Sequence, residues 1–259
     1  MGGRVLKMDA APSFALRADG EIMPASSLIA DWSHDQKTAF RRSPITFGHG
    51  LSETRLFDDE ALVRLIDDCP PALRDIRRLD GRVETRPLTG RQVLEGVRQG
   101  RLEARLSQVE SVSPVLGTLM GKIASEIRRQ APASRAGRPS GQLILSPAQG
   151  WSTPNAEGPA AMLFHLRGRT RLWVYPAAGA PRAAKGRMFD LEPGVALALP
   201  PRAPHRIESL DDVNVSLSVR TRSWVSRLAD GAGRAGALLR RWEQPMAERS
   251  TTDAIAAQS

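Results

Sequence analysis

The side chains best suited to chemistry are concentrated in one stretch of the chain, from Gly141 to Trp224. This stretch contains His165 and His205, two of the four histidines, together with the only tyrosine. Imidazole is a common metal ligand and proton carrier near neutral pH, so we expect any catalytic or metal site to lie here. The sequence offers no competing motif: it has no P-loop, no G-x-G-x-x-G after a strand, no G-x-S-x-G and no H-E-x-x-H.

The other two histidines and the single cysteine are predicted to be structural. His34 lies between Ser33 and Asp35, which suits a solvated or capping residue, and His49 lies between two glycines, which suits a loop. Cys69 follows an apolar helical run and is predicted to be a small core residue. A lone cysteine excludes an intrachain disulfide and a metal held by a cysteine cluster.

Composition narrows the class of protein. The formal net charge is +9, and nearly all of the basic residues are arginine. They are scattered without a block of five or six like charges, so nucleic-acid binding is not favoured and rests on net charge alone. No apolar run approaches the ~20 residues that span a membrane, and the first residues lack the apolar segment of a secretory signal. We therefore expect a cytoplasmic protein with no membrane partner.

The first half of the chain is predicted to be mainly helical. Asp58 can cap a helix over 58–69, Thr89 and Gln92 have capping-box spacing at the start of 89–99, and Pro114 suits the first turn of a helix that ends near 130. The chain is predicted to have five parts. They are an irregular arm (1–45), a helical or mixed part (46–130), a linker (131–140), a β core (141–225) and a short helix with a disordered tail (226–259).

The second half has the pattern of short strands bounded by Gly or Pro turns, which favours a β-sandwich or barrel. In 213–219, Val213, Val215, Leu217 and Val219 share one face of a strand, while the polar residues between them share the other and could line a cavity. Strands are predicted at 142–146, 160–167, 170–175, 195–199, 204–208 and 213–220.

Segments from both halves of the chain resemble the bacterial cupin-like relatives of the JmjC oxygenases, which use iron(II) and 2-oxoglutarate. The matching segments are FGHGLSETRLFDDEALVRLID (47–67), LFHLRGRTRLWVYP (163–176), EPG (192–194), PPRAPHRIES (200–209) and NVSLS (214–218). The resemblance covers roughly residues 45–225. It implies a mostly β fold with flanking helices (α+β), in which a double-stranded β-helix, the cupin or jelly-roll core, follows an N-terminal helical region.

The resemblance also implies a metal site, in which a His-x-Asp motif and a distal histidine form a facial triad. Counting back from Gly168, the motif positions hold Asn155 and Glu157, and the distal histidine is His205. Residues two apart in an extended segment point the same way, so Asn155 and Glu157 can still converge. Glu157 remains an anionic oxygen donor, but the amide of Asn155 is a weak ligand. We therefore predict a degenerate site with reduced iron affinity.

A second departure concerns the cosubstrate. The family often has a lysine, two residues after the strand-ending glycine, that pairs with the distal carboxylate of 2-oxoglutarate, and this position is Thr170 here. The neighbouring Arg169 and Arg171 could replace its charge, since a guanidinium can bind a carboxylate through two hydrogen bonds. Thr153, next to Ser152, and Ser216 are further candidates for binding the cosubstrate.

Other residues of the stretch have competing interpretations. His165 is a cavity-lining residue or a substitute ligand, and Asn214 lines the pocket or satisfies backbone groups. Trp173 and Tyr175 are expected to be packing residues. No catalytic residue is predicted beyond the metal ligands.

Two functions therefore remain open. The first is an oxygenase that uses iron(II) and 2-oxoglutarate to hydroxylate a protein side chain or a small molecule. The second is a non-catalytic binding or regulatory protein that keeps the barrel as a scaffold and needs no cofactor, because a fold does not guarantee a function. A homodimer is compatible with either.

Overall fold

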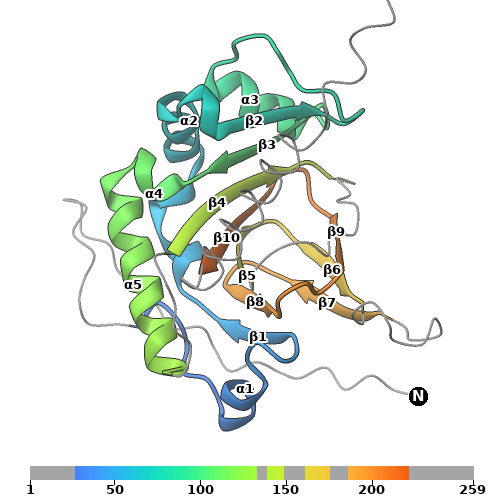
Figure 1. Ribbon diagram of the computed structural model, residues 1–259. Helices are drawn as coiled ribbons and strands as arrows, with labels where there is room; N and C mark the ends of the chain where they lie inside the picture. Colours follow the sequence, from blue (N-terminus) through green and yellow to red (C-terminus); the bar gives the residue numbers. More distant parts are fainter. Residues whose placement is uncertain (1–26, 133–138, 149–160, 176–185, 222–259) are drawn as a thin grey trace, which may run out of the picture. The chain divides into compact units, whose positions relative to one another are not determined.

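Short strands with alternating apolar residues form two antiparallel sheets in the computed structural model, which describes residues 27–132, 139–148, 161–175 and 186–221 (Figure 1). The larger sheet has the strand order β1-β8-β5-β10-β4-β3-β2 and the smaller has the order β7-β6-β9. The strands are β1 (Ile45–Gly48), β2 (Arg74–Arg78), β3 (Leu102–Ser107), β4 (Pro139–Ser146), β5 (Ala161–Arg167), β6 (Thr170–Val174), β7 (Arg187–Leu191), β8 (Val195–Leu199), β9 (His205–Ser209) and β10 (Asn214–Thr221).

Two of the helices begin where local capping signals predict. The side chain of Asp58 accepts a hydrogen bond from the Ala61 amide at 2.8 Å, and Thr89 and Gln92 form a reciprocal capping box. The helices are α1 (His34–Ala39), α2 (Asp59–Asp68), α3 (Gly90–Arg98), α4 (Val109–Val112) and α5 (Pro114–Gln130), with 3₁₀ turns at Leu51–Glu53, Arg55–Phe57 and Pro71–Leu73. Of the described helices, none has the length and apolar character needed to cross a membrane.

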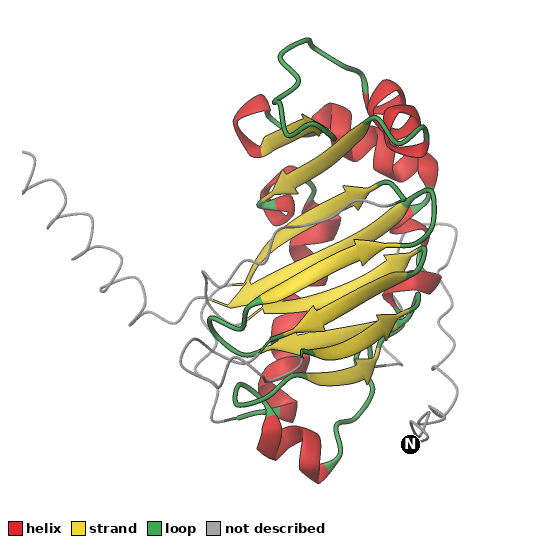
Figure 2. Cartoon of the chain, turned by 90° about the vertical axis from the view of Figure 1, so that its right-hand side faces the viewer, coloured by secondary structure: helices red, strands yellow, loops and turns green. Residues whose placement is uncertain are grey.

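The two faces of the larger sheet pack against different parts of the structure. On one face Val215, Leu217 and Val219 of β10 join the cluster that contains Leu119 and Ile123 of α5. Figure 1 shows α4 and α5 along the side of this sheet that faces away from β6, β7 and β9, and in Figure 2 helices are partly hidden behind the strands. Burial of these apolar side chains is the main force that holds the helices against the strands.

The other face of the larger sheet meets the smaller sheet across a second apolar cluster. Its residues come from both sheets: Leu163, Leu172, Val174, Phe189, Leu191, Leu197 and Leu199. Asn214, Ser216 and Ser218 of β10 are buried and lie on the opposite side of the strand from Val215 and Leu217. The predicted alternation is therefore confirmed, and the fold is the expected mostly β one, with flanking helices.

The first half of the chain contributes more to the β core than the sequence predicts. β3 pairs with β4, and β1 pairs with β8, so strands from 46–130 and from 141–225 share one sheet. The prediction missed β2, β3, β7, α1 and the short helix α4. Cys69 is 2% exposed, which confirms it as a core residue. All described residues belong to the unit Met1–Thr221.

The segment before α1 is attached to α5 by a buried carboxylate. Glu126 is 4% exposed, and its side chain accepts hydrogen bonds from the Leu28 amide at 3.0 Å, the Ile29 amide at 2.8 Å and the Ser27 hydroxyl at 3.0 Å. This segment also follows the free edge of β1, where the Ala30 amide donates to the Gly48 carbonyl at 2.9 Å. Glu126 therefore fixes a stretch of backbone that covers a sheet edge.

Candidate metal site in the barrel

Of the three predicted metal ligands, His205 is the one within the described residues. It is the first residue of β9 and pairs with Val174 of β6. Side chains of directly paired residues lie on the same face of a sheet, and Val174 belongs to the cluster between the sheets. His205 therefore lies on the inward face of the smaller sheet, at one end of the barrel that the two sheets form. Asn155, Glu157, Thr153 and Ser152 lie outside the described residues.

The hydrogen bond of His205 sets its tautomer. Its Nδ1 lies 2.9 Å from the carbonyl oxygen of Ala203. A carbonyl can only accept, so Nδ1 carries the proton and the neutral ring presents the lone pair of Nε2. A backbone carbonyl on the second ring nitrogen is the usual support for a histidine that binds a metal. This residue thus fits an iron ligand.

Strand pairing brings the start of β5 to the same end of the barrel. Ala161 pairs with Leu199, the last residue of β8, and the chain then reaches His205 within six residues. The predicted motif positions lie just before Ala161 in the sequence. Among the described residues alone, no group of three or more His, Cys, Asp or Glu side chains could hold a metal ion.

Thr170 lies on the inward face but is surrounded by uncharged groups. It is 2% exposed, pairs with Leu191 and Ser209, and donates a long hydrogen bond of 3.4 Å to Oδ1 of Asn214. These described neighbours provide no cation for the distal carboxylate of 2-oxoglutarate. A lysine at this position would form an ion pair with the distal carboxylate, whereas Thr170 and its neighbours cannot.

Arg169 and Arg171 do not replace the missing charge there. Arg169 is 62% exposed and pairs with Asp211 at 3.0 Å, while Arg171 is 37% exposed and pairs with Asp190 at 2.9 Å. Both alternate with Thr170 along the strand and so point to the outer face. Their proposed role in binding the cosubstrate is not supported by this geometry.

His165 and Ser216 are occupied with each other. Nε2 of His165 lies 2.8 Å from the Gly168 carbonyl, so it carries the proton, and Nδ1 accepts from the Ser216 hydroxyl at 2.9 Å. Burial lowers the pKa of His165. The ring has no free lone pair for a metal, and the Ser216 hydroxyl is not available as a donor to a cosubstrate. Both residues instead support the turn at Gly168.

His49, which the sequence places in a loop with a structural role, is fully buried. Its ring packs edge-on against Phe164, with 5.3 Å between the ring centroids, and Nδ1 accepts from the Leu51 amide at 3.1 Å. Nε2 has no hydrogen-bond partner among the described residues. Since Nδ1 is an acceptor, the neutral ring carries its proton on Nε2, and this histidine is not a metal ligand in this conformation.

The buried ring of His49 predicts an acid-sensitive fold. Burial lowers the pKa of His49 to about 4, although the nearby backbone of Val195 and of His165 opposes the shift. Between the unfolded pKa of about 6.5 and this value, the unfolded chain binds the extra proton, so stability falls as the pH falls. We expect the free energy of unfolding to drop by about 2 kcal/mol between pH 7 and pH 5 through this group.

Urea unfolding at several pH values measures this effect. His49→Leu should flatten the pH dependence between 6.5 and 4, whereas His34→Leu, at an exposed position, should leave it unchanged. An equally steep profile in His49→Leu would assign the acid sensitivity to other groups.

Comparison with known proteins supports the fold. The structure is similar to the ribosomal oxygenase YcfD from Escherichia coli in complex with cobalt and 2-oxoglutarate, with 18% identity and a TM-score of 0.51, covering 79% of this chain and 54% of that one. A second structure of Escherichia coli YcfD gives 18% identity and a TM-score of 0.51, covering 83% and 57%. This chain therefore spans little more than half the length of those proteins.

Neither a protein-family model nor a curated protein matches this chain. Identity of 18% shows a shared fold and nothing finer. What the comparison establishes is that the two facing sheets have the cupin-like arrangement found in an oxygenase.

Proposed function

We propose that this chain is a JmjC-like cupin oxygenase with a weakened iron site, which hydroxylates a protein side chain or a small molecule. The observation that carries the proposal is His205, which lies on the inward face and presents Nε2. Glu157 would supply the anionic ligand and Asn155 a weak third one. The chemistry that iron supplies when bound is the activation of dioxygen as 2-oxoglutarate is oxidised.

The connectivity of the chain supports this set of ligands. Glu157 precedes Ala161 by four residues, and an extended chain spans at most about 3.5 Å per residue, so their Cα atoms are within about 14 Å of each other. Ala161 is paired at the end of the barrel from which the chain continues to His205. Both segments can therefore reach one metal ion.

The surroundings of Thr170 favour a second function, that of a non-catalytic binding or regulatory protein. A 2-oxoglutarate oxygenase must hold the distal carboxylate of its cosubstrate, and the described inward groups beside Thr170 are neutral. In this alternative the barrel is a scaffold, and neither iron nor 2-oxoglutarate is required. The substrate or partner, a cytoplasmic location and a homodimer remain predictions under both functions.

One experiment separates these functions. The protein is purified without oxygen and titrated with iron(II), and conversion of 2-oxoglutarate to succinate is then measured in air. The oxygenase predicts stoichiometric iron that is lost in His205→Ala, together with turnover. Absence of both iron and turnover would rule the oxygenase out.

Restoring the missing imidazole tests the position of the motif. We expect Asn155→His to raise iron(II) affinity by at least about tenfold, since even residues that only support metal ligands act on that scale. Anaerobic calorimetry with iron(II) measures the dissociation constant. Ala156→His places the same group one residue along, where an extended segment points the other way, and should not raise the affinity. Equal effects of the two variants would show that this segment does not face the metal.

A further inference from the structure

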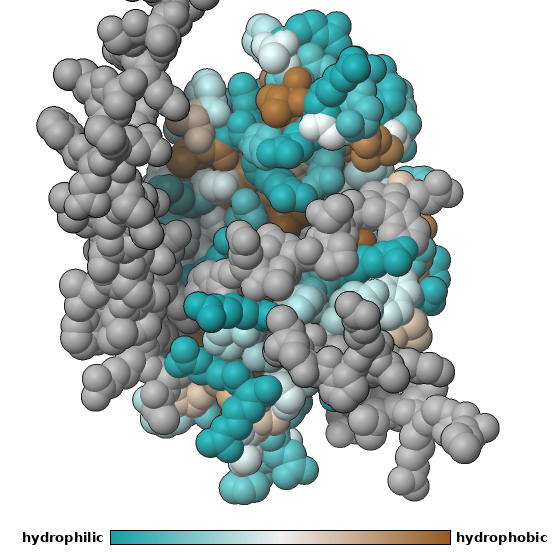
Figure 3. Space-filling view, turned by 45° about the vertical axis from the view of Figure 1, so that its right-hand side comes forward, coloured by the Kyte–Doolittle hydropathy of each residue, from teal (hydrophilic) through white to brown (hydrophobic). Residues whose placement is uncertain are grey.

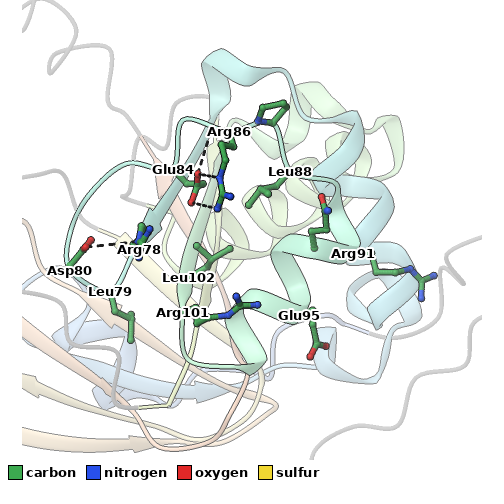
Figure 4. A pocket seen from close by; sticks show the side chains of 12 residues that line it. Arg78, Leu79, Asp80, Glu84, Arg86, Leu88, Arg91, Glu95, Arg101 and Leu102 are labelled. Atoms are coloured by element: carbon green, nitrogen blue, oxygen red, sulfur yellow. Dashed lines mark hydrogen bonds and ion pairs between the residues drawn. The ribbon is translucent and has the colours of Figure 1, made fainter.

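A cavity lies outside the barrel, between α3, the ends of β2 and β3, and the loop that joins β2 to α3. Its volume is about 800 Å³. Leu88 and Leu102 lie at its centre, with Arg78, Arg86 and Arg101 around them (Figure 4). This size is typical of ligand sites, which commonly occupy several hundred Å³.

The walls of this cavity are held by close backbone packing. The backbone of α3 approaches its neighbours closely at two glycines. A Cβ on Gly90 would overlap the Val63 carbonyl, and a Cβ on Gly96 would overlap Leu102. The opposite wall returns along the edge of β2, where the Glu84 amide donates to the Ile76 carbonyl at 2.9 Å. The cavity is therefore built into the fold rather than left by a loose loop.

Arginine dominates the charge around this cavity. Residues 74–105 contain nine arginines, no lysine and five acidic residues. Each acidic residue already has a partner: for example, Glu84 pairs with Arg86 at 3.0 Å, and Asp80 lies 3.9 Å from Arg78 and also from Arg82. Arg101 lines the cavity and has no ion pair with any described residue. A guanidinium with five donors is thus left to bind an anion.

The rest of the lining indicates which anion would fit. Leu79 is 50% exposed at the rim, and Leu88 and Leu102 provide an apolar centre. Figure 3 shows hydrophobic surface enclosed by hydrophilic residues in this upper part of the molecule. None of the described lining residues is aromatic, although single-stranded nucleic acids are usually held by stacking on aromatic rings.

We propose that this cavity binds an acidic peptide segment. One carboxylate of the peptide pairs with Arg101, Arg78 and Arg86 attract its other acidic groups, and an aliphatic side chain covers the leucines. The inference does not depend on the proposed oxygenase function, because none of these residues belongs to the barrel interior.

Fluorescence polarisation with a labelled hexapeptide EELELE tests the site on the full chain. We expect Arg101→Gln to weaken binding about tenfold, the scale of a charge-assisted hydrogen bond. Arg82→Gln is the matched control: it removes the same charge from the same region, is 84% exposed and does not line the cavity. It should leave the affinity within about twofold, as expected for a screened surface charge. Thermal unfolding confirms that both variants fold.

Two further probes define the outcomes that contradict the proposal. The peptide EESESE should bind more weakly than EELELE, because it cannot cover the leucines. Equal binding of these peptides, tighter binding of a single-stranded RNA, or equal losses in Arg101→Gln and Arg82→Gln would show a general polyanion surface. No binding of EELELE at millimolar concentration would also overturn the site. Slower amide exchange of residues 79–88 on adding EELELE would locate the peptide at the cavity.

Discussion

Gly168→Ala should destabilise the fold by about 2–5 kcal/mol. Gly168 has φ of +77°, a conformation that costs a residue with a side chain about 1–2 kcal/mol. A Cβ there would also lie 2.5 Å from Oδ1 of Asn214 and 2.6 Å from the backbone oxygen of Val213. The Val213 oxygen belongs to the backbone beside β10, so the chain must shift to make room. Urea unfolding at pH 7 measures the loss.

A second glycine separates the two contributions. Gly81 has φ of +82°, but a Cβ there would meet no atom within 4 Å. Gly81→Ala should therefore cost only the backbone part, and the difference between the variants is the cost of crowding at Gly168. Because Nε2 of His165 donates to the Gly168 carbonyl, the NMR signal of that imidazole proton should shift in Gly168→Ala and not in Gly81→Ala. Equal losses in both variants would contradict the crowding.

Local signals predicted α2, α3 and α5, whereas α1 was missed although Ser33 and Gln36 form a capping box at its start. The cap at Asp58 and the capping box of Thr89 and Gln92 act over three residues, so the sequence contains both partners of each contact. The apolar and polar alternation of β10 was equally clear, because each of its faces is buried against a different layer.

The elements that the sequence missed depend on partners far along the chain. β7 begins with two exposed residues, Arg187 and Met188, and is a strand because it pairs with β6. β3 did carry a usable signal, since Leu102, Ala104 and Leu106 are buried and alternate with partly exposed residues. Its short length and its place between two helices concealed this pattern.

At the candidate site, the alternation of side chains along β6 predicts the orientation of both arginines. Once Leu172 is assigned to the inward face, Arg171 must point outward, and so must Arg169 beside the inward Thr170. The burial of His49 was not accessible in this way, since it depends on Phe164, more than a hundred residues away in the sequence. The tautomer of His205 likewise follows from a carbonyl position that only the folded backbone provides.

Glu126→Gln should destabilise the protein by about 2–4 kcal/mol. The carboxylate accepts from two backbone amides, one on each oxygen, and both donors are buried. An amide side chain has one oxygen, so its NH₂ group would face either the Leu28 or the Ile29 amide and leave that donor without a partner. A buried donor that loses its partner costs about 1–3 kcal/mol, and the loss of negative charge weakens the hydrogen bonds that remain.

Glu60→Gln on α2 is the matched control, because it makes the same chemical change at an exposed position. It should alter the free energy of unfolding by less than about 0.5 kcal/mol. Amide exchange adds a local measurement: the Leu28 and Ile29 amides should exchange faster in Glu126→Gln even where the β10 amides do not. If these two amides stay as protected as in the parent protein, the carboxylate is not what holds this segment. If they are released, the edge of β1 loses its cover, and β1 is the strand that pairs with β8 at the side of the barrel. The buried carboxylate of α5 would then be shown to support the barrel that presents His205.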